Sequence, residues 1–193
     1  MTAERPRAEA VVIGASAGAV EALSAVLPAL PAGFRLPVAV VVHLPPDRPS
    51  IMAELFRAKC RVDVREAEDK EPLEAGTVYF APPDYHLLVE LDRRLSLSSE
   101  EPVLYSRPSI DVLFESAADA YGSGLVGVVL TGANSDGARG LRAVRDAGGV
   151  ALVQRPDQAQ VAAMPQAALD ACPGAVPLSL DEIASFLIAA TPA

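Results

Sequence analysis

Two unbroken apolar runs constrain the fold of this chain more than any other feature of its sequence. Val38 to Val42 and Leu125 to Leu130 contain only apolar residues and one glycine. A strand with one face in solvent alternates apolar and polar residues, whereas a strand of a parallel sheet is buried on both faces and is apolar throughout. The shorter run from Ala10 to Ile13 has the same character. The three runs therefore predict central strands of a mostly parallel sheet.

The segments between these runs carry helical patterns. Apolar residues recur at helical spacing from Ala19 to Leu30, and Pro28 and Pro31 mark the end of that helix. Another helix is expected to begin after Ser109, with this serine as its N-cap. Strands that alternate with helices predict an α/β fold with a doubly wound, mostly parallel sheet.

One segment departs from this alternation. Leu87 to Leu97 contains two short alternating stretches with Asp92-Arg93-Arg94 between them, which predicts an antiparallel hairpin appended to the sheet. No linker or internal repeat divides the chain. We therefore expect residues 1–193 to form a single domain with a flexible tail of about residues 1–8.

The composition excludes several classes of protein. Twenty-five acidic residues against 16 basic ones give a net charge of −9, which disfavours nucleic acid and anionic membranes as partners. No stretch reaches the ~18 apolar residues of a membrane span, and the N-terminus lacks a signal-peptide core. Cys60 and Cys172 form no C-x-x-C pair and are interpreted as reduced thiols. We expect a cytoplasmic protein without membrane insertion, and neither a metal nor a cofactor.

The turn after the first strand carries the first candidate for catalysis. Gly14, Ser16 and Gly18 form G-x-S-x-G, in which small flanking residues let a serine lie exposed on a tight strand-to-helix turn. Such a turn also binds phosphate at a helix N-terminus, and it can serve close packing alone. The motif by itself leaves these alternatives open.

Two further strand ends supply the partners that a nucleophilic serine needs. His43 follows the run that ends at Val42, and Asp136 lies in the loop after Leu130. Parallel strands end at one edge of a sheet, where sites form. A serine needs a base and the base needs an orienting carboxylate, so Ser16, His43 and Asp136 are the predicted catalytic residues.

His86 is the one competing base, because the chain has two histidines. It lies in the hairpin segment, where a solvated or hydrogen-bonding histidine is typical. The competing acids Asp47 and Asp63 follow no strong core strand. The order serine, histidine, aspartate also differs from that of α/β-hydrolases, in which the acid precedes the histidine.

From Val11 to about Leu187 the chain closely resembles the catalytic domain of the CheB family of chemotaxis protein-glutamate methylesterases. The resemblance rests on the segments I-G-A-S-A-G with the following E-A-L, V-V-H-L-P-P, E-A-E-D, V-Y-F-A-P-P-D-Y-H, R-P-S-I-D-V-L-F and G-V-V-L-T-G-A-N-S-D-G-A-R-G. It implies a Ser-His-Asp triad at Ser16, His43 and Asp136, the same residues that their types and strand positions indicate.

The resemblance also implies a reaction. It is hydrolysis of γ-glutamyl methyl esters on the cytoplasmic domain of methyl-accepting chemoreceptors, which yields glutamate and methanol, and many members also deamidate glutamines. Backbone N–H groups near Ala17 and Ala133 are expected to hold the oxyanion. No receiver domain precedes this domain in the sequence, so we expect no control by an attached receiver. A separate response regulator is a candidate partner.

The chain departs from the family pattern at two places. Ser16-Ala17-Gly18-Ala19 stands where the family usually has S-T-G-G, and Ala133-Asn134 stands where it usually has methionine and glycine in T-G-M-G. A threonine hydroxyl and a methionine side chain near the nucleophile are therefore lost. Because the oxyanion donors are backbone groups, we expect the departures to alter the fit of the substrate rather than to abolish catalysis.

Two other functions remain as alternatives. A catalytically silent adaptor would keep the fold and bind a receptor or signalling partner, but it has no physical need to keep all three triad residues. A nucleotide-binding module requires an acidic residue after the second strand, where His43 stands. Among the remaining charged residues, we expect Arg107 to pair locally and Asp111 and Asp119 to lie exposed on a helix.

Overall fold

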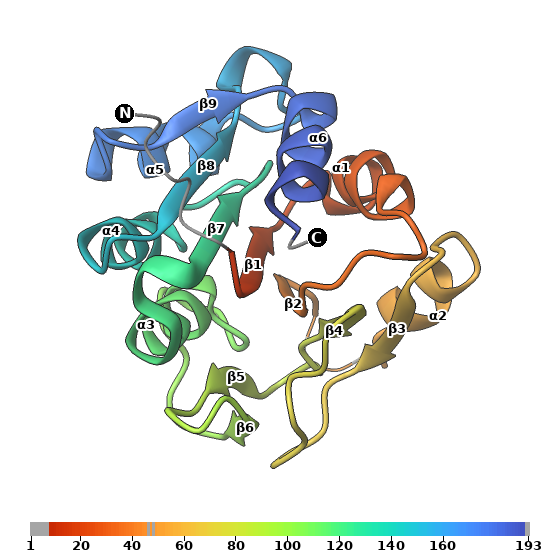
Figure 1. Ribbon diagram of the computed structural model, residues 1–193. Helices are drawn as coiled ribbons and strands as arrows, with labels where there is room; N and C mark the ends of the chain where they lie inside the picture. The colour runs from red at the N-terminus through yellow and green to blue at the C-terminus, as the bar shows by residue number, and fades with distance from the viewer. Residues whose placement is uncertain (1–7, 46, 48, 192–193) are drawn as a thin grey trace.

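The computed structural model describes residues 8–45, 47 and 49–191 (Figure 1). Within these residues seven strands form one parallel sheet, in the order β3-β4-β2-β1-β7-β8-β9. The strands are β1 (Ala10–Ala15), β2 (Val38–Val42), β3 (Asp63–Glu66), β4 (Thr77–Phe80), β7 (Leu125–Val129), β8 (Val150–Gln154) and β9 (Val176–Leu178). The prediction of an α/β fold with a doubly wound, mostly parallel sheet is confirmed.

Helices cover both faces of this sheet. They are α1 (Ala19–Val26), α2 (Met52–Arg57), α3 (Ile110–Tyr121), α4 (Ala138–Asp146), α5 (Ala163–Ala171) and α6 (Leu180–Ala190), with short 3-10 turns at Leu27–Ala29, Gly122–Gly124 and Pro156–Gln158. α1, α2 and α6 pack on one face, and α3, α4 and α5 on the other (Figure 1). The helix predicted from Ala19 to Leu30 changes to a 3-10 turn after Val26, because Pro28 has no N–H to donate to an α-helical hydrogen bond.

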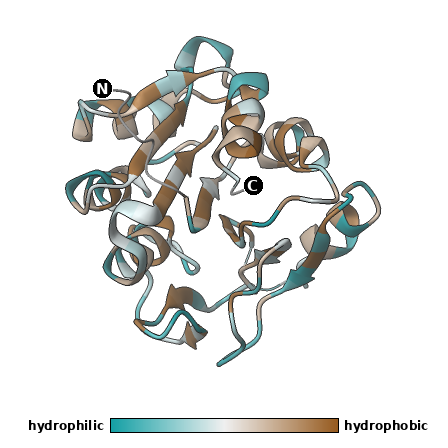
Figure 2. Cartoon of the chain, viewed as in Figure 1, coloured by the Kyte–Doolittle hydropathy of each residue, from teal (hydrophilic) through white to brown (hydrophobic). Residues whose placement is uncertain are grey.

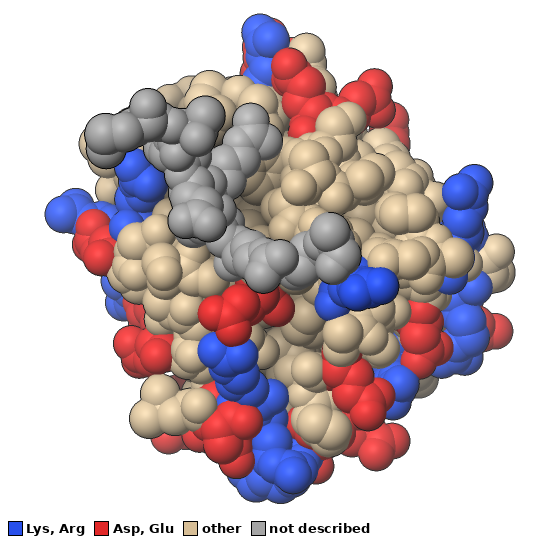
Figure 3. Space-filling model, viewed as in Figure 1, with Lys and Arg blue, Asp and Glu red and all other residues tan. Residues whose placement is uncertain are grey.

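The central strands are apolar throughout because their side chains alternate between two buried cores. Val11 and Ile13 of β1 contact the core under α1 and α6, whereas Ala10 and Val12 contact the core under α3 and α4. β1 pairs with β2 on one side and with β7 on the other, with Val11 opposite Val38. Figure 2 shows the resulting hydrophobic centre of the sheet, and acidic and basic side chains intermix on the surface seen in Figure 3.

The predicted hairpin is also confirmed. β5 (His86–Val89) and β6 (Leu95–Ser98) form a separate antiparallel sheet that packs against α3.

At the N-terminus, residues 1–7 of the predicted tail lie outside the described residues, and Ala8 is buried in the core. No helix in the described part of the chain is both long enough and apolar enough to cross a membrane.

The sheet order creates a crevice at the carboxyl ends of three neighbouring strands. The chain leaves β1 through α1 on one face, and it leaves β7 through α4 on the opposite face. Ligands of open α/β sheets bind where neighbouring strands send their connections to opposite faces. Ser16, His43 and Asp136 follow β1, β2 and β7, the three strands at this point.

Candidate active site

Ser16 lies on a turn that is held from two sides. Its N–H donates to the carbonyl of Thr131 over 2.9 Å, and the N–H of Ala19 donates to the carbonyl of Ser16 over 2.9 Å. The Thr131 hydroxyl donates to the carbonyl of Ala17 over 2.9 Å. Gly18 has φ 84, a left-handed conformation that favours glycine and starts α1 directly after the serine. The loop after β7 and the first turn of α1 therefore fix a half-buried Ser16 together.

His43 follows β2 and is hydrogen-bonded to Asp136. Its Nε2 lies 2.7 Å from Asp136 Oδ2, and the His43 side chain is 12% exposed while that of Asp136 is fully buried. Burial opposes ionisation of Asp136, but the hydrogen bonds from His43 and from two backbone N–H groups outweigh burial and lower its pKa below the ordinary value. With Asp136 ionised, His43 Nε2 carries the ring proton and Nδ1 remains the free basic nitrogen.

The start of α3 supplies three more hydrogen bonds to Asp136. The N–H of Ile110 donates to Oδ2 over 2.7 Å, the N–H of Asp111 to Oδ1 over 2.9 Å, and the Ser109 hydroxyl to Oδ1 over 2.8 Å. A carboxylate is favoured there because helix N-termini present free N–H groups and a positive dipole end. Ser109 is at the N-cap position, but its side chain accepts no capping hydrogen bond. The prediction that Ser109 caps this helix is wrong in this respect, because Asp136 takes the donors.

Asp111 makes the reciprocal contact at the start of α4. Its Oδ1 accepts the N–H of Gly137 over 2.9 Å and the N–H of Gly140 over 2.7 Å. Burial raises the pKa of Asp111, an effect that the N–H of Gly140 opposes and the charge of Asp136 reinforces. The expectation that Asp111 lies exposed is wrong, since it is 2% exposed, whereas Asp119 is exposed as expected. Asp136 accepts N–H groups from the start of α3, which contains Asp111, and Asp111 accepts N–H groups from the start of α4, which follows Asp136. We call these two residues the reciprocal aspartate pair.

Two glycines allow α3 to approach the site this closely. A Cβ on Gly14 would collide with the side chain of Ile110, and a Cβ on Gly137 would lie 2.8 Å from Ile110 Cγ2. Gly137 also has φ 97, which a residue with a side chain rarely adopts. The missing side chains let the first residue of α3 contact both the end of β1 and the loop that carries Asp136.

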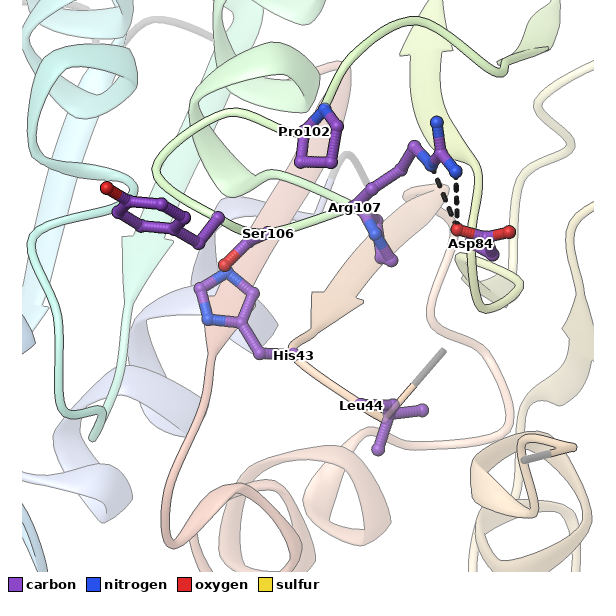
Figure 4. Close-up of a pocket in the computed structure, with 8 residues that line it drawn as sticks. His43, Leu44, Asp84, Pro102, Ser106 and Arg107 are labelled. Atoms are coloured by element: carbon purple, nitrogen blue, oxygen red, sulfur yellow. Dashed lines mark hydrogen bonds and ion pairs between the residues drawn. The ribbon is translucent and has the colours of Figure 1, made fainter. Parts of the chain in front are cut away.

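Ser16 and His43 line the same cavity, which has a volume of about 400 Å³. A second cavity of about 250 Å³ shares His43 and Leu44 with it (Figure 4). Among the described residues no hydrogen bond joins Ser16 to His43, and the N–H groups of Ala17 and Ala133 have no acceptor. Ala133 does not line the cavity at Ser16. The structure thus brings His43 together with both Ser16 and Asp136, and it leaves the N–H group of Ala17 free beside the serine.

His86 and Arg107 both hold the segment 99–109, and Arg107 also lines the cavity of about 250 Å³ that contains His43. His86 is 2% exposed, its Nε2 lies 3.0 Å from the carbonyl of Glu101, and its Nδ1 accepts the N–H of Ser109 over 3.1 Å. Arg107 pairs with Asp84 over 2.6 Å, so the prediction of local pairing is confirmed. Within the described residues, no group of three or more His, Cys, Asp or Glu side chains could hold a metal ion.

Sequence reasoning missed two residues that hold the site. Thr131 follows β7 directly, so its place at the sheet edge could have suggested a role. Asp111 gave no such signal, because an acidic residue in the first turn of a helix is favoured by the helix dipole even when it is exposed.

Comparisons with known proteins agree with this geometry. The family model described as CheB methylesterase matches residues 11–187. A putative protein-glutamate methylesterase/protein-glutamine glutaminase of Leptospira interrogans is 46% identical over 180 residues, which cover 93% of both chains. The enzyme of Archaeoglobus fulgidus with the corresponding name is 39% identical over 83% of this chain and 47% of its own length. The crystal structure of the Thermotoga maritima CheB methylesterase catalytic domain superposes with a TM-score of 0.87 and 30% identity, over 94% of this chain and 98% of that one.

Proposed function

The chain belongs to the CheB methylesterase family, and from this membership we propose that it hydrolyses glutamate γ-methyl esters of chemoreceptor-like proteins and releases methanol. The relatives are also named as protein-glutamine glutaminases. A side-chain amide can follow the same acyl-transfer route, so glutamine deamidation is part of the proposal. None of the comparisons favours a catalytically silent adaptor.

The single observation that carries the proposal is the hydrogen bond between His43 and Asp136 in the crevice that also contains Ser16. A histidine whose Nε2–H is held by a buried carboxylate has one tautomer and a free Nδ1. This arrangement is suited to taking a proton from a serine hydroxyl, because the carboxylate stabilises the imidazolium that results.

The proposed reaction proceeds in two halves. Ser16 Oγ attacks the ester carbonyl while its proton moves to His43 Nδ1, and the carbonyl oxygen becomes an oxyanion. Free N–H groups at Ala17 and Ala133 are the proposed oxyanion donors. The intermediate then collapses, His43 returns the proton to the methoxy group, and methanol leaves. Water deprotonated by His43 next attacks the acyl-serine, which restores Ser16 and leaves a glutamate side chain.

The proposal also covers place and partners. Its substrate would be the cytoplasmic domain of a methyl-accepting chemoreceptor, so we place the protein in the cytoplasm, in chemotaxis signalling. A separate response regulator is a proposed second partner. We also propose that residues 1–193 act as one catalytic domain. The match of the family model to residues 11–187 supports this proposal.

The test compares the wild type with Ser16→Ala on chemoreceptor membranes that carry tritiated methyl groups on glutamate. We expect the wild type to release methanol and the variant to release none. Equal release from both would refute Ser16 as the nucleophile. Absence of release from either protein, together with failure of a serine-directed phosphonate to label Ser16, would refute the esterase and favour an adaptor.

A further inference from the structure

A two-residue turn beside the candidate site has an unfavourable backbone conformation. Val103 and Ser106 exchange backbone hydrogen bonds of 3.0 and 2.9 Å, and Leu104 and Tyr105 between them have φ 49 and 62. Positive φ at both central residues is the type I′ pattern, which Asn-Gly adopts readily. A leucine or tyrosine adopts it only against steric repulsion from its own Cβ. The residues at this tip therefore do not serve the stability of the turn.

No burial compensates for this strain at the tip, whereas the base of the turn is held firmly. Leu104 is 48% exposed and Tyr105 is fully exposed, at 103%. Next to them, the guanidinium of Arg107 donates to Asp84 and also to the carbonyls of Ser99 and Glu100, at 2.9 and 3.0 Å. Figure 4 shows this side chain turned towards Asp84 and away from His43. The tip is thus presented to solvent on a rigid support.

The turn also forms a wall of the crevice. Tyr105 and Ser106 line the cavity of about 250 Å³ together with His43, and this cavity shares His43 and Leu44 with the one at Ser16. In Figure 4 the side chain of Ser106 faces the ring of His43. The strained tip therefore lies at the mouth of the candidate site.

Several exposed apolar side chains belong to the segments that line these two cavities. Eight large hydrophobic side chains are exposed among the described residues, and five of them line these two cavities or adjoin a lining residue in sequence. These five form what we call the apolar rim: Val20, Ile51, Tyr85, Leu104 and Tyr105. Exposed apolar residues concentrated at one place mark interaction sites, whereas scattered ones are ordinary.

We propose that Leu104 and Tyr105 are specificity residues that bind apolar side chains of the substrate protein on either side of the esterified glutamate. This inference rests on the function proposed above. The cavity at Ser16 takes the ester side chain itself, and Leu104 and Tyr105 do not line that cavity, so they are placed to contact the polypeptide that carries the ester. A tyrosine side chain has few rotatable bonds, so it loses little conformational freedom on binding, and it is a frequent centre of binding energy. Backbone strain that persists without burial is typical of such functional positions.

The test replaces the tip by the residues that the turn itself favours, in the double variant Leu104→Asn/Tyr105→Gly. Relief of strain is expected to raise the melting temperature by about 2–4 °C. For a soluble chemoreceptor signalling fragment with methylated glutamates, KM is expected to rise by about 10- to 30-fold with little change in kcat. Hydrolysis of the small ester N-acetyl-glutamate γ-methyl ester is expected to stay within about twofold of the wild type. Leu91→Asn, an exposed leucine in the β5–β6 turn, is the matched control and should change neither substrate.

Each other outcome overturns the proposal in a recognisable way. An unchanged KM for the receptor fragment would exclude a docking role for the tip while the proposed function stands. Equal losses of hydrolysis on both esters would show that the turn maintains the geometry of the active site and does not bind the substrate protein. A dimeric wild type and a monomeric variant in light scattering would assign the rim to a second copy of the chain. Failure of the wild type on both esters would refute the proposed function itself.

Discussion

The reciprocal aspartate pair predicts a large effect of removing Asp111. In Asp111→Ala the buried N–H groups of Gly137 and Gly140 lose the acceptor that they now contact at 2.9 and 2.7 Å. A buried donor without a partner costs about 1–3 kcal/mol. Partial relaxation and the removal of a buried charge offset some of this cost, so we expect the free energy of unfolding to fall by about 2–4 kcal/mol. The melting temperature should then fall by roughly 4–16 °C.

Asp111→Asn is the matched control, because its amide oxygen can still accept both N–H groups. It loses the attraction between a carboxylate and the α4 dipole, which is about 0.3–1 kcal/mol, and it also removes the repulsion from Asp136. We therefore expect its stability to stay within about 1 kcal/mol of the wild type.

The raised pKa of Asp111 determines how the difference in stability between the wild type and Asp111→Asn depends on pH. Relative to Asp111→Asn, the wild type is most stable below the ordinary aspartate pKa, and this advantage is lost as pH rises through the raised pKa.

The measurement is urea unfolding of the three proteins followed by circular dichroism at several pH values. Equal destabilisation by the alanine and the asparagine substitutions would refute the argument, because the accepting oxygen would then not be what matters. A loss smaller than about 0.5 kcal/mol for Asp111→Ala would refute it as well.

Two further predictions concern the close approach of α3 and the ionised aspartate. Gly14→Ala places a methyl group against Ile110 and should lower the free energy of unfolding by about 1–3 kcal/mol. Gly33→Ala is the control and should be nearly neutral, because nothing lies within 4 Å of the added Cβ. Equal effects of the two substitutions in thermal unfolding would contradict this prediction. Asp136→Asn should lower kcat for ester hydrolysis by about 10³- to 10⁴-fold, because an amide no longer fixes the tautomer of His43 or stabilises its charged form, and a loss below about tenfold would count against it. Because the pKa of Asp136 is lowered in the folded protein, its ionised carboxylate should stabilise the fold above the ordinary aspartate pKa. This stabilisation should be lost as pH falls through the lowered pKa. Urea unfolding of the wild type and of Asp136→Asn at several pH values measures it.

The parts of the fold that were predictable are those that local sequence determines. The run Val38–Val42 matches the observed β2 residue for residue, because strands buried on both faces leave an unbroken apolar signal bounded by turns. Ser16, His43 and Asp136 could be selected together because parallel strands end at a common edge, and the structure places all three beyond the carboxyl ends of neighbouring strands.

The support of the site was not predictable in the same way. Asp111 and Ser109 are ordinary residues for the start of a helix, and their contacts with Asp136 depend on a residue 25 and 27 positions further along the chain. The same limit applies to Leu104 and Tyr105, since their types contradict the turn that they form. Tertiary contacts decided the roles of Asp111 and Ser109, and no pattern in the local sequence indicates such contacts.

The pairing of distant strands has a consequence for the synthesis of the protein. His43 and Asp136 are 93 positions apart, and β1 pairs with β7 only when Leu125 and the residues after it are available. A nascent chain that has reached β2 already carries Ser16 and His43, but it has no carboxylate to orient the histidine and no loop to hold the serine turn. Esterase activity can therefore arise only after Asp136 has been synthesised, so a ribosome that stalls before β7 leaves an inert fragment and not an unregulated enzyme.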